Sequence, residues 1–200
     1  EAEGVIMSSG ADIISTGAAT ITINGTVSDS AGTDGVKIDD VGTTITSVSG
    51  GISITGNTIG STTSDHGIEL RPGSAVSSTG TAQVMLNGMS SNGEGVLIQS
   101  ALVTSLNGPL SVMGTGGNYG VSVYENADVT STGSATITLD GTVNSATGKD
   151  GVYIEDAGTT VTSVDGNISI TGNTMGSGAD DRGIQIGSGG VVESTGSAQV

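Results

Sequence analysis

The stretch GVYIEDAGTTVTSVDGNISITG, residues 151–172, decides the fold, because the rest of the chain repeats it in looser form. Residues 35–56, GVKIDDVGTTITSVSGGISITG, carry nearly the same text 116 residues earlier. Self-similarity with a period of about 30 residues is typical of stacked repeat architectures. The sequence therefore predicts about seven coils in one array over residues 1–200, starting near residues 4, 35, 67, 95, 120, 151 and 183.

Each unit contains three short runs in which aliphatic and polar residues alternate, as they do in half-buried β-strands. In the first run the inward residues are pairs such as Val36 with Ile38 and Val152 with Ile154. Glycine interrupts every window long enough to test a helical period. We therefore predict an all-β fold, a right-handed parallel β-helix (solenoid) with three short strands per coil.

A longer repeat is superimposed on the coils. Residues 11–84 match residues 127–200 at 45 of 74 positions, so four coils form a superrepeat of 116 residues. Lengths vary between the third run and the next first run, as in residues 26–34 against residues 115–119. Insertions are tolerated where backbone is not stacked, so we expect an exposed loop at this corner.

Stacking would turn each unit position into a column. One column holds serine in every coil, and because no general base accompanies it we expect hydroxyls that satisfy backbone groups at a corner rather than nucleophiles: Ser15, Ser47, Ser78, Ser105, Ser131, Ser163 and Ser194. The same alignment predicts that Lys37 pairs with Glu69, and Asp39 with Arg71, between neighbouring coils.

Composition excludes several function classes. Twenty acidic residues against four basic ones give a net charge of −16, which argues against nucleic acid and anionic membrane surfaces as partners. The chain has no cysteine, so it can form neither disulfides nor thiolate metal sites. The sequence has no run of 18 apolar residues, and we expect no membrane insertion.

Calcium is the ligand that the loops favour, because hard cations take oxygen ligands and the loops are rich in aspartate. The candidate ligands are Asp34, Asp150, Asp180 and Asp181, with Asp29 and Asp65 as further loop acids. The calcium-binding nonapeptide GGxGxDxUx is absent, so a site that holds a cofactor or metal is not the leading expectation. His66 has no second histidine to join it, which argues against a transition-metal site.

Paired carboxylates raise the alternative of polysaccharide cleavage. Adjacent strand residues point to opposite sides, so a solvated acidic edge is the preferred interpretation and no catalytic residue is predicted; the pairs are Asp39 and Asp40, Glu155 and Asp156, and Asp180 and Asp181. Aromatic rings can stack on sugars, which keeps surface glycans as alternative partners; the chain offers Tyr119, Tyr124 and Tyr153.

The pattern G-[VI]-x-I, then [VI]-T-S, then G-x-I-x-I-T-G resembles the β-strand repeats of very large bacterial surface proteins. These belong with the filamentous-haemagglutinin-like and autotransporter-passenger β-helices. The resemblance covers the whole chain and implies a β-helix, an extracellular or cell-surface setting and no catalytic motif. The chain stops at Val200 inside a third run, so we expect a window of a longer array or a fibre protomer.

These observations predict a non-enzymatic structural segment of an extracellular filament, sheath or cell-surface adhesin. It would act as a stiff rod that associates with copies of itself end to end and laterally. The alternatives are a calcium-dependent adhesin and a polysaccharide-acting β-helix enzyme. An enzyme should break the repeat at one coil to build a cleft, whereas a rod keeps its coils alike.

Overall fold

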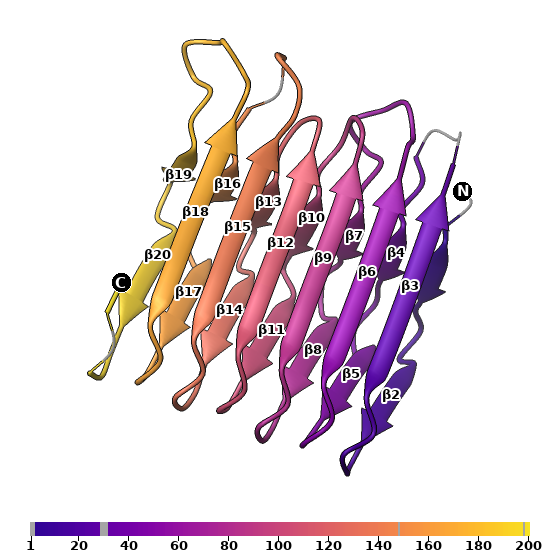
Figure 1. Ribbon diagram of the computed structural model, residues 1–200, viewed down its shortest axis with the longest axis vertical. Coiled ribbons are helices and arrows are strands. Elements are labelled where there is room, and N and C mark those ends of the chain that lie inside the picture. The colour runs from indigo at the N-terminus through magenta and orange to yellow at the C-terminus, as the bar shows by residue number, and fades with distance from the viewer. Residues whose placement is uncertain (1–2, 29–31, 148, 198) are drawn as a thin grey trace.

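The computed structural model describes residues 3–28, 32–147, 149–197 and 199–200, and these residues form one stack of similar coils (Figure 1). The described part of the chain contains twenty strands, and none of its elements is a helix. It therefore holds no helix that could cross a membrane. The prediction of an all-β solenoid with three strands per coil is confirmed.

The strands form three parallel sheets, one for each side of the coil. Sheet A holds the first strand of each coil: β1 (Val5–Met7), β4 (Val36–Ile38), β7 (Ile68–Leu70), β10 (Val96–Gln99), β13 (Val121–Tyr124), β16 (Val152–Ile154) and β19 (Ile184–Ile186). Sheet B holds the second: β2 (Asp12–Ser15), β5 (Thr44–Ser47), β8 (Ala75–Ser78), β11 (Leu102–Ser105), β14 (Asp128–Ser131), β17 (Thr160–Ser163) and β20 (Val191–Ser194). Sheet C holds the third: β3 (Ile21–Val27), β6 (Ile52–Thr58), β9 (Val84–Ser90), β12 (Leu110–Gly116), β15 (Ile137–Val143) and β18 (Ile168–Thr174).

The described residues make six complete coils and add β19 and β20 as the start of a seventh. The coil is right-handed. In Figure 1 the strands of sheet C run upwards in front while the chain advances from right to left, and the strands behind run downwards.

The register places each inward aliphatic residue directly on its counterpart in the next coil. Val36 pairs with Ile68 and Ile68 with Val96, and all three side chains are fully buried. Alternate residues along each strand face outward, because successive side chains of a strand point to opposite sides. Each buried Val or Ile contributes roughly 1.5–3 kcal/mol, so the core is a set of continuous aliphatic columns.

The serine column is present as predicted, with Ser47 paired to Ser78 and Ser78 to Ser105 in sheet B. Most of its hydroxyls donate to a backbone carbonyl in the turn that follows. The Ser47 hydroxyl lies 2.5 Å from the Gly50 carbonyl, and the Ser105 hydroxyl lies 2.6 Å from that of Gly108. The buried hydroxyls of Ser78 and Ser163 have no such partner. The Ser194 hydroxyl donates to the Val164 carbonyl of the preceding coil instead. The column is therefore a set of turn-closing hydrogen bonds with three exceptions.

Two of the corners that follow strands of sheet A use an aspartate in a left-handed conformation. Asp40 has a φ of 73° and Asp156 a φ of 78°. The Asp40 carboxylate accepts the backbone N–H of Ser9 at 2.9 Å, and the Asp156 carboxylate accepts that of Glu125 at 3.3 Å. Each aspartate thus binds the backbone of the preceding coil, which is a structural role for one member of two predicted carboxylate pairs.

The glycine that opens each coil lies where the backbones of sheets C and A touch. A Cβ placed on Gly88 would lie 1.9 Å from the carbonyl oxygen of Gly95, and one on Gly95 would lie 2.3 Å from the backbone nitrogen of Thr115. The chain leaves sheet C beside the first glycine and returns to sheet A at the second. The variable loop between them projects from the stack, as predicted, at the top of Figure 1.

We predict that Gly88→Ala lowers the free energy of unfolding by about 2–3 kcal/mol, because its methyl group cannot fit without moving the backbone of Gly95. The control is Gly17→Ala, since a Cβ at Gly17 would have no atom within 4 Å. Urea unfolding followed by circular dichroism measures both variants. Equal stability of the two would contradict backbone contact at this corner.

We also predict that Ser105→Ala costs about 1 kcal/mol, because the Gly108 carbonyl loses its hydroxyl donor in a buried turn. Ser163→Ala should be neutral or slightly stabilising, since the buried Ser163 hydroxyl donates no hydrogen bond. Thermal unfolding of the two variants beside the parent chain separates these outcomes. A larger loss for Ser163→Ala would show that the serine column acts in some other way.

Candidate functional site

The outer face of sheet A and the loop edge beside it hold the side chains that can do chemistry. Three outward columns run along it, at the residue before each coil-opening glycine and at the second and fourth residues after it. The four basic residues of the chain, its single histidine and its three tyrosines lie in these columns or directly beside them: Lys37, Arg71, Lys149, Arg182, His66, Tyr119, Tyr124 and Tyr153. The basic and aromatic side chains of this acidic chain thus lie on one face.

Two hollows open on this face. The first, the His66 hollow, has a volume of about 450 Å³, and its lining includes Asp34, Lys37, His66, Glu69, Glu94 and Tyr124. The second, the Arg182 hollow, has a volume of about 690 Å³, and its lining includes Tyr119, Lys149, Asp150, Tyr153, Asp181 and Arg182. The hollows lie 116 residues apart in sequence, at equivalent coils of the superrepeat.

The two copies of the superrepeat differ most on this face. Five of its six compared outward positions in β4 and β7 and their flanks change between copies: Lys37 to Tyr153, Asp39 to Glu155, His66 to Arg182, Glu69 to Gln185 and Arg71 to Gly187. The outward residues of sheet C are nearly unchanged, with identity at Thr20, Thr22, Thr26, Ser53, Thr55 and Asn57. The outward residues of sheet C are therefore nearly the same in the two copies of the superrepeat, whereas those of sheet A differ between the copies.

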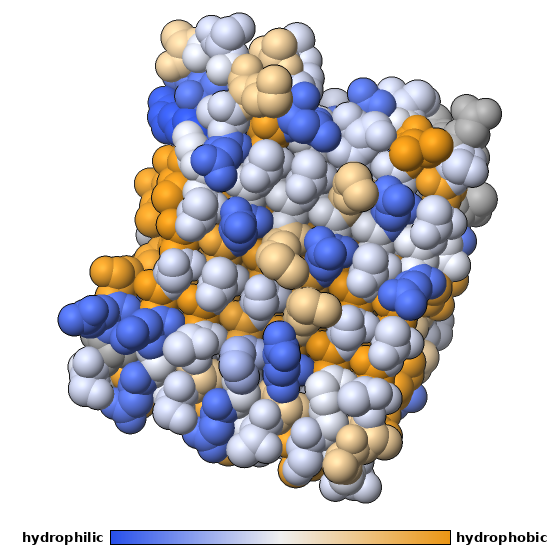
Figure 2. Space-filling view, viewed as in Figure 1, coloured by the Kyte–Doolittle hydropathy of each residue, from blue (hydrophilic) through white to orange (hydrophobic). Residues whose placement is uncertain are grey.

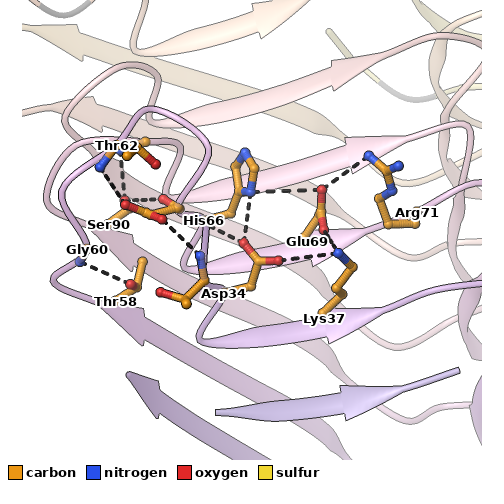
Figure 3. Close-up of polar contacts among 12 residues, drawn as sticks. Asp34, Lys37, Thr58, Gly60, Thr62, His66, Glu69, Arg71 and Ser90 are labelled. Carbon is orange, nitrogen blue, oxygen red and sulfur yellow. Dashed lines mark hydrogen bonds and ion pairs between the residues drawn. The ribbon is translucent and has the colours of Figure 1, made fainter. Parts of the chain in front are cut away.

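Asp34 and His66 form the centre of the first hollow (Figure 3). One Asp34 carboxylate oxygen accepts the backbone N–H of His66 at 2.9 Å and lies 2.9 Å from His66 Nδ1. Glu69 Oε1 lies 3.9 Å from the same Nδ1. Lys37 Nζ bridges the two acids, at 3.1 Å from Glu69 Oε2 and 3.8 Å from Asp34 Oδ2, so the predicted pairing of Lys37 with Glu69 is confirmed.

The predicted pairing of Asp39 with Arg71 is wrong. Arg71 Nη1 instead donates to Gln99 Oε1 at 2.9 Å and lies 3.4 Å from Glu69 Oε1. The Asp39 carboxylate accepts the backbone N–H of Asp40 at 2.8 Å. The guanidinium thus turns toward the following coil and the buried Glu69, while Asp39 is held in its own corner.

Burial sets the protonation of this cluster. Burial raises the pKa of Glu94 to about 7, and the nearby charge of His66 only partly offsets it. Burial likewise raises the pKa of Glu69, helped by the charge of Asp34. Burial opposes the charged forms of Asp34 and His66 too, but their mutual hydrogen bonds and opposite charges lower the pKa of Asp34 and raise that of His66. The cluster therefore contains a strong ion pair beside two carboxyl groups that are reluctant to ionise.

Three of the four candidate calcium ligands meet in the Arg182 hollow, but the positively charged side chain of Arg182 lies among them. Asp180 Oδ1 is 3.3 Å from the Arg182 guanidinium. Asp150 accepts the backbone N–H of Arg182 at 2.8 Å, and Asp181 accepts that of Gly178. These carboxylates therefore shape the loop and bind the arginine.

Asp34, the fourth candidate, lies in the other hollow. Asp65 is fully buried beneath it and accepts the backbone N–H groups of Thr33 at 2.9 Å and Thr62 at 2.5 Å. The Ser90 hydroxyl donates to the Asp65 carbonyl. Asp29 lies outside the described residues. Asp65 is thus a loop-shaping acceptor rather than an open ligand.

The tyrosines also gather, although they come from three different coils. The rings of Tyr119 and Tyr153 have centroids 4.9 Å apart, and those of Tyr124 and Tyr153 lie 6.4 Å apart. Lys149 Nζ lies 5.2 Å from the centre of the Tyr119 ring. The rings pack on one another and form an aromatic strip between the two hollows.

Sequence reasoning set His66 aside because it has no second histidine. The structure brings it two carboxylates, from Asp34 in the preceding coil and from Glu69 three residues later. The signal was the spacing, since Asp34 and His66 each stand directly before a coil-opening glycine. Within the described residues, Asp34, His66 and Glu69 form a group whose ligand atoms all lie within 4.8 Å of one another.

Comparison with protein-family models, with curated proteins and with solved structures finds no match to this chain. The chain is a β-solenoid built from repeated three-strand coils, as the sequence resemblance implies.

We predict that Glu94→Gln makes the protein more stable than the parent at pH 8 and changes little at pH 5. The raised pKa means that the folded state holds the Glu94 proton more tightly, so this stability is present below about pH 4.5 and is lost as the pH rises toward 7. The difference should reach ~3 kcal/mol in urea unfolding. Glu193→Gln, at an exposed position, controls for the loss of one negative charge. The same pH profile for both variants would contradict a buried Glu94.

Proposed function

We propose that this chain is a non-enzymatic structural segment of an extracellular filament, sheath or cell-surface adhesin, and that it acts as a stiff rod. The observation that supports this most is the unbroken register of all three sheets. At the junction between the first superrepeat and the second, Val121 pairs with Val152 and Leu110 with Ile137. One superrepeat thus follows another without a change in stacking.

Stiffness follows from this continuity. Each coil is bound to the next by parallel backbone ladders on all three sides, so bending the rod would require breaking hydrogen bonds in at least one sheet. The outer surface of sheet C is flat and mostly polar, as Figure 2 shows. One of its rows reads Thr22, Ser53, Met85, Ser111, Thr138 and Ser169 from coil to coil.

The sequence resemblance to filamentous-haemagglutinin-like repeats supports the extracellular and cell-surface setting. The net charge of −16 keeps separate rods apart at low salt and makes lateral association dependent on ionic strength. We propose end-to-end and lateral association with further copies as the rod's main partnership. Surface glycans are the alternative partner, because the strip of Tyr119, Tyr124 and Tyr153 offers aromatic rings.

A rod that is built by stacking should lengthen in proportion to the number of coils. We predict that each additional copy of residues 11–126, inserted after residue 126, extends the particle by about 19 Å, or four coils of 4.8 Å. Small-angle X-ray scattering and electron microscopy of chains with one, two and three copies measure the increment. Unfolded or globular inserted copies would overturn the stacking, and particles that never join at high concentration would overturn self-association.

The second candidate is an enzyme that acts on polysaccharides. One observation favours it, since the His66 hollow places Glu69 and Glu94, with raised pKa values, near Tyr124. A carboxyl kept protonated by burial can serve as a general acid in glycoside cleavage. Release of reducing ends from acidic or neutral polysaccharides by the parent chain, and its loss in Glu69→Gln, would favour the enzyme over the rod.

A further inference from the structure

We propose that the His66 hollow is a binding site for a divalent transition-metal ion of the zinc type, with Asp34, His66 and Glu69 as its protein ligands and Glu94 as a further carboxyl group that lines the same hollow. The proposal is independent of the rod function, because it rests on side chains of the outer face of sheet A and not on stacking. It replaces the expectation that His66 would stand alone.

The spacing of the ligand atoms suits a small metal ion. His66 Nδ1 lies 2.9 Å from Asp34 Oδ1 and 3.9 Å from Glu69 Oε1. Ligands bound at about 2.0–2.2 Å in tetrahedral geometry lie roughly 3.4 Å from one another. The two separations bracket this value, and all three ligand atoms lie within 4.8 Å of one another, so side-chain adjustments on the order of one ångström would bring them to a bound ion.

The ligand types select the class of metal. Calcium and magnesium are bound almost entirely by oxygen atoms, whereas imidazole together with carboxylates is typical of zinc and its neighbours in the first transition series. His66 supplies the nitrogen, and its ring is positioned by the backbone N–H that it gives to Asp34. Zinc should therefore bind more tightly than calcium at this site.

Glu94 gives independent support for a cation in this hollow, because one of its buried oxygen atoms lacks a hydrogen bond. The Glu94 side chain lines the hollow from the next coil. It stands in the same column as His66, since each of the two residues directly precedes a coil-opening glycine and the Gly67 N–H donates to the Glu94 carbonyl. The residue is 7% exposed, and its buried Oε2 atom accepts no hydrogen bond, although the Ser122 hydroxyl, which also lacks a partner, lies beside this carboxyl group. A buried carboxyl oxygen without a hydrogen bond is costly, and the positive charge of a cation bound in the hollow would offset part of that cost.

In the metal-free protein, Lys37 supplies the positive charge beside Asp34 and Glu69. Its ammonium group lies 3.1 Å from Glu69 Oε2 and 3.8 Å from Asp34 Oδ2, at the end of a long and flexible side chain. A metal ion has to displace this positive charge. Lys37 is therefore a competitor for the site, and its removal should strengthen metal binding while it weakens the metal-free protein.

The later copy of the superrepeat provides an internal control. Asp150, Arg182 and Gln185 stand at the positions of Asp34, His66 and Glu69. A guanidinium and an amide there replace an imidazole and a carboxylate, and a guanidinium cannot coordinate a cation. The chain should therefore bind one ion, in the first copy.

Isothermal titration calorimetry with zinc chloride alone tests the site on the full chain. We expect one zinc ion per chain. Affinity should fall more than ~10-fold in His66→Arg, which installs the residue of the later copy. It should rise about 10-fold in Lys37→Met, which removes the competing charge. Asp150→Asn, in the Arg182 hollow, should bind as the parent does, and calcium should bind more weakly than zinc.

A spectroscopic readout separates direct coordination from an effect on folding. Cobalt(II) added in place of zinc should give visible absorption bands of a four-coordinate nitrogen and oxygen site in the parent and in Lys37→Met, and none in His66→Arg. Circular dichroism shows whether each variant is folded. The proposal is overturned by an unchanged affinity in His66→Arg, by an equal loss in Asp150→Asn, or by weaker binding in folded Lys37→Met.

Discussion

Parallel stacking of equivalent strands in register is the constraint on which the rest of the structure depends. Every coil gives its backbone hydrogen bonds to the coils before and after it, so no strand is stable by itself. A one-residue slip would turn Val36 and Ile68 outward and their polar neighbours inward. The close contact of backbones at glycines such as Gly88 and Gly95 fixes the corner from which the register starts. Small inward residues and paired glycines are thus consequences of one geometry.

The same geometry gives the outer surface unusual freedom. A residue that faces outward contributes little to the stack, so its chemistry can change without loss of the fold. The two copies of the superrepeat illustrate this, because they keep the core and the sheet C face while His66 becomes Arg182 and Glu69 becomes Gln185. Since neighbouring coils lie about 4.8 Å apart, residues about 30 positions apart in sequence become direct neighbours. A solenoid can therefore assemble a polar cluster from single residues of successive coils.

A rod and a metal-binding or glycan-binding face are compatible within this architecture. The three ladders supply rigidity, and rigidity holds Asp34, His66 and Glu69 in place without a dedicated scaffold. Glu69 and Glu94 are unfavourable for stability, because buried carboxyl groups destabilise a protein when they ionise. That cost is local to the His66 hollow, and it singles this hollow out from the rest of the face.

The sequence by itself determined the fold class, the serine column and the pairing of Lys37 with Glu69, because each is a direct result of periodicity. It predicted wrongly that Arg71 would pair with Asp39, since a long side chain can reach several acceptors and only the packed surface decides among them. It also passed over His66, because side-chain burial and the approach of Glu94 depend on how the loops fold over sheet A. Periodicity specifies which residues share a column, but only the tertiary structure decided which columns are buried and which side chains within them meet.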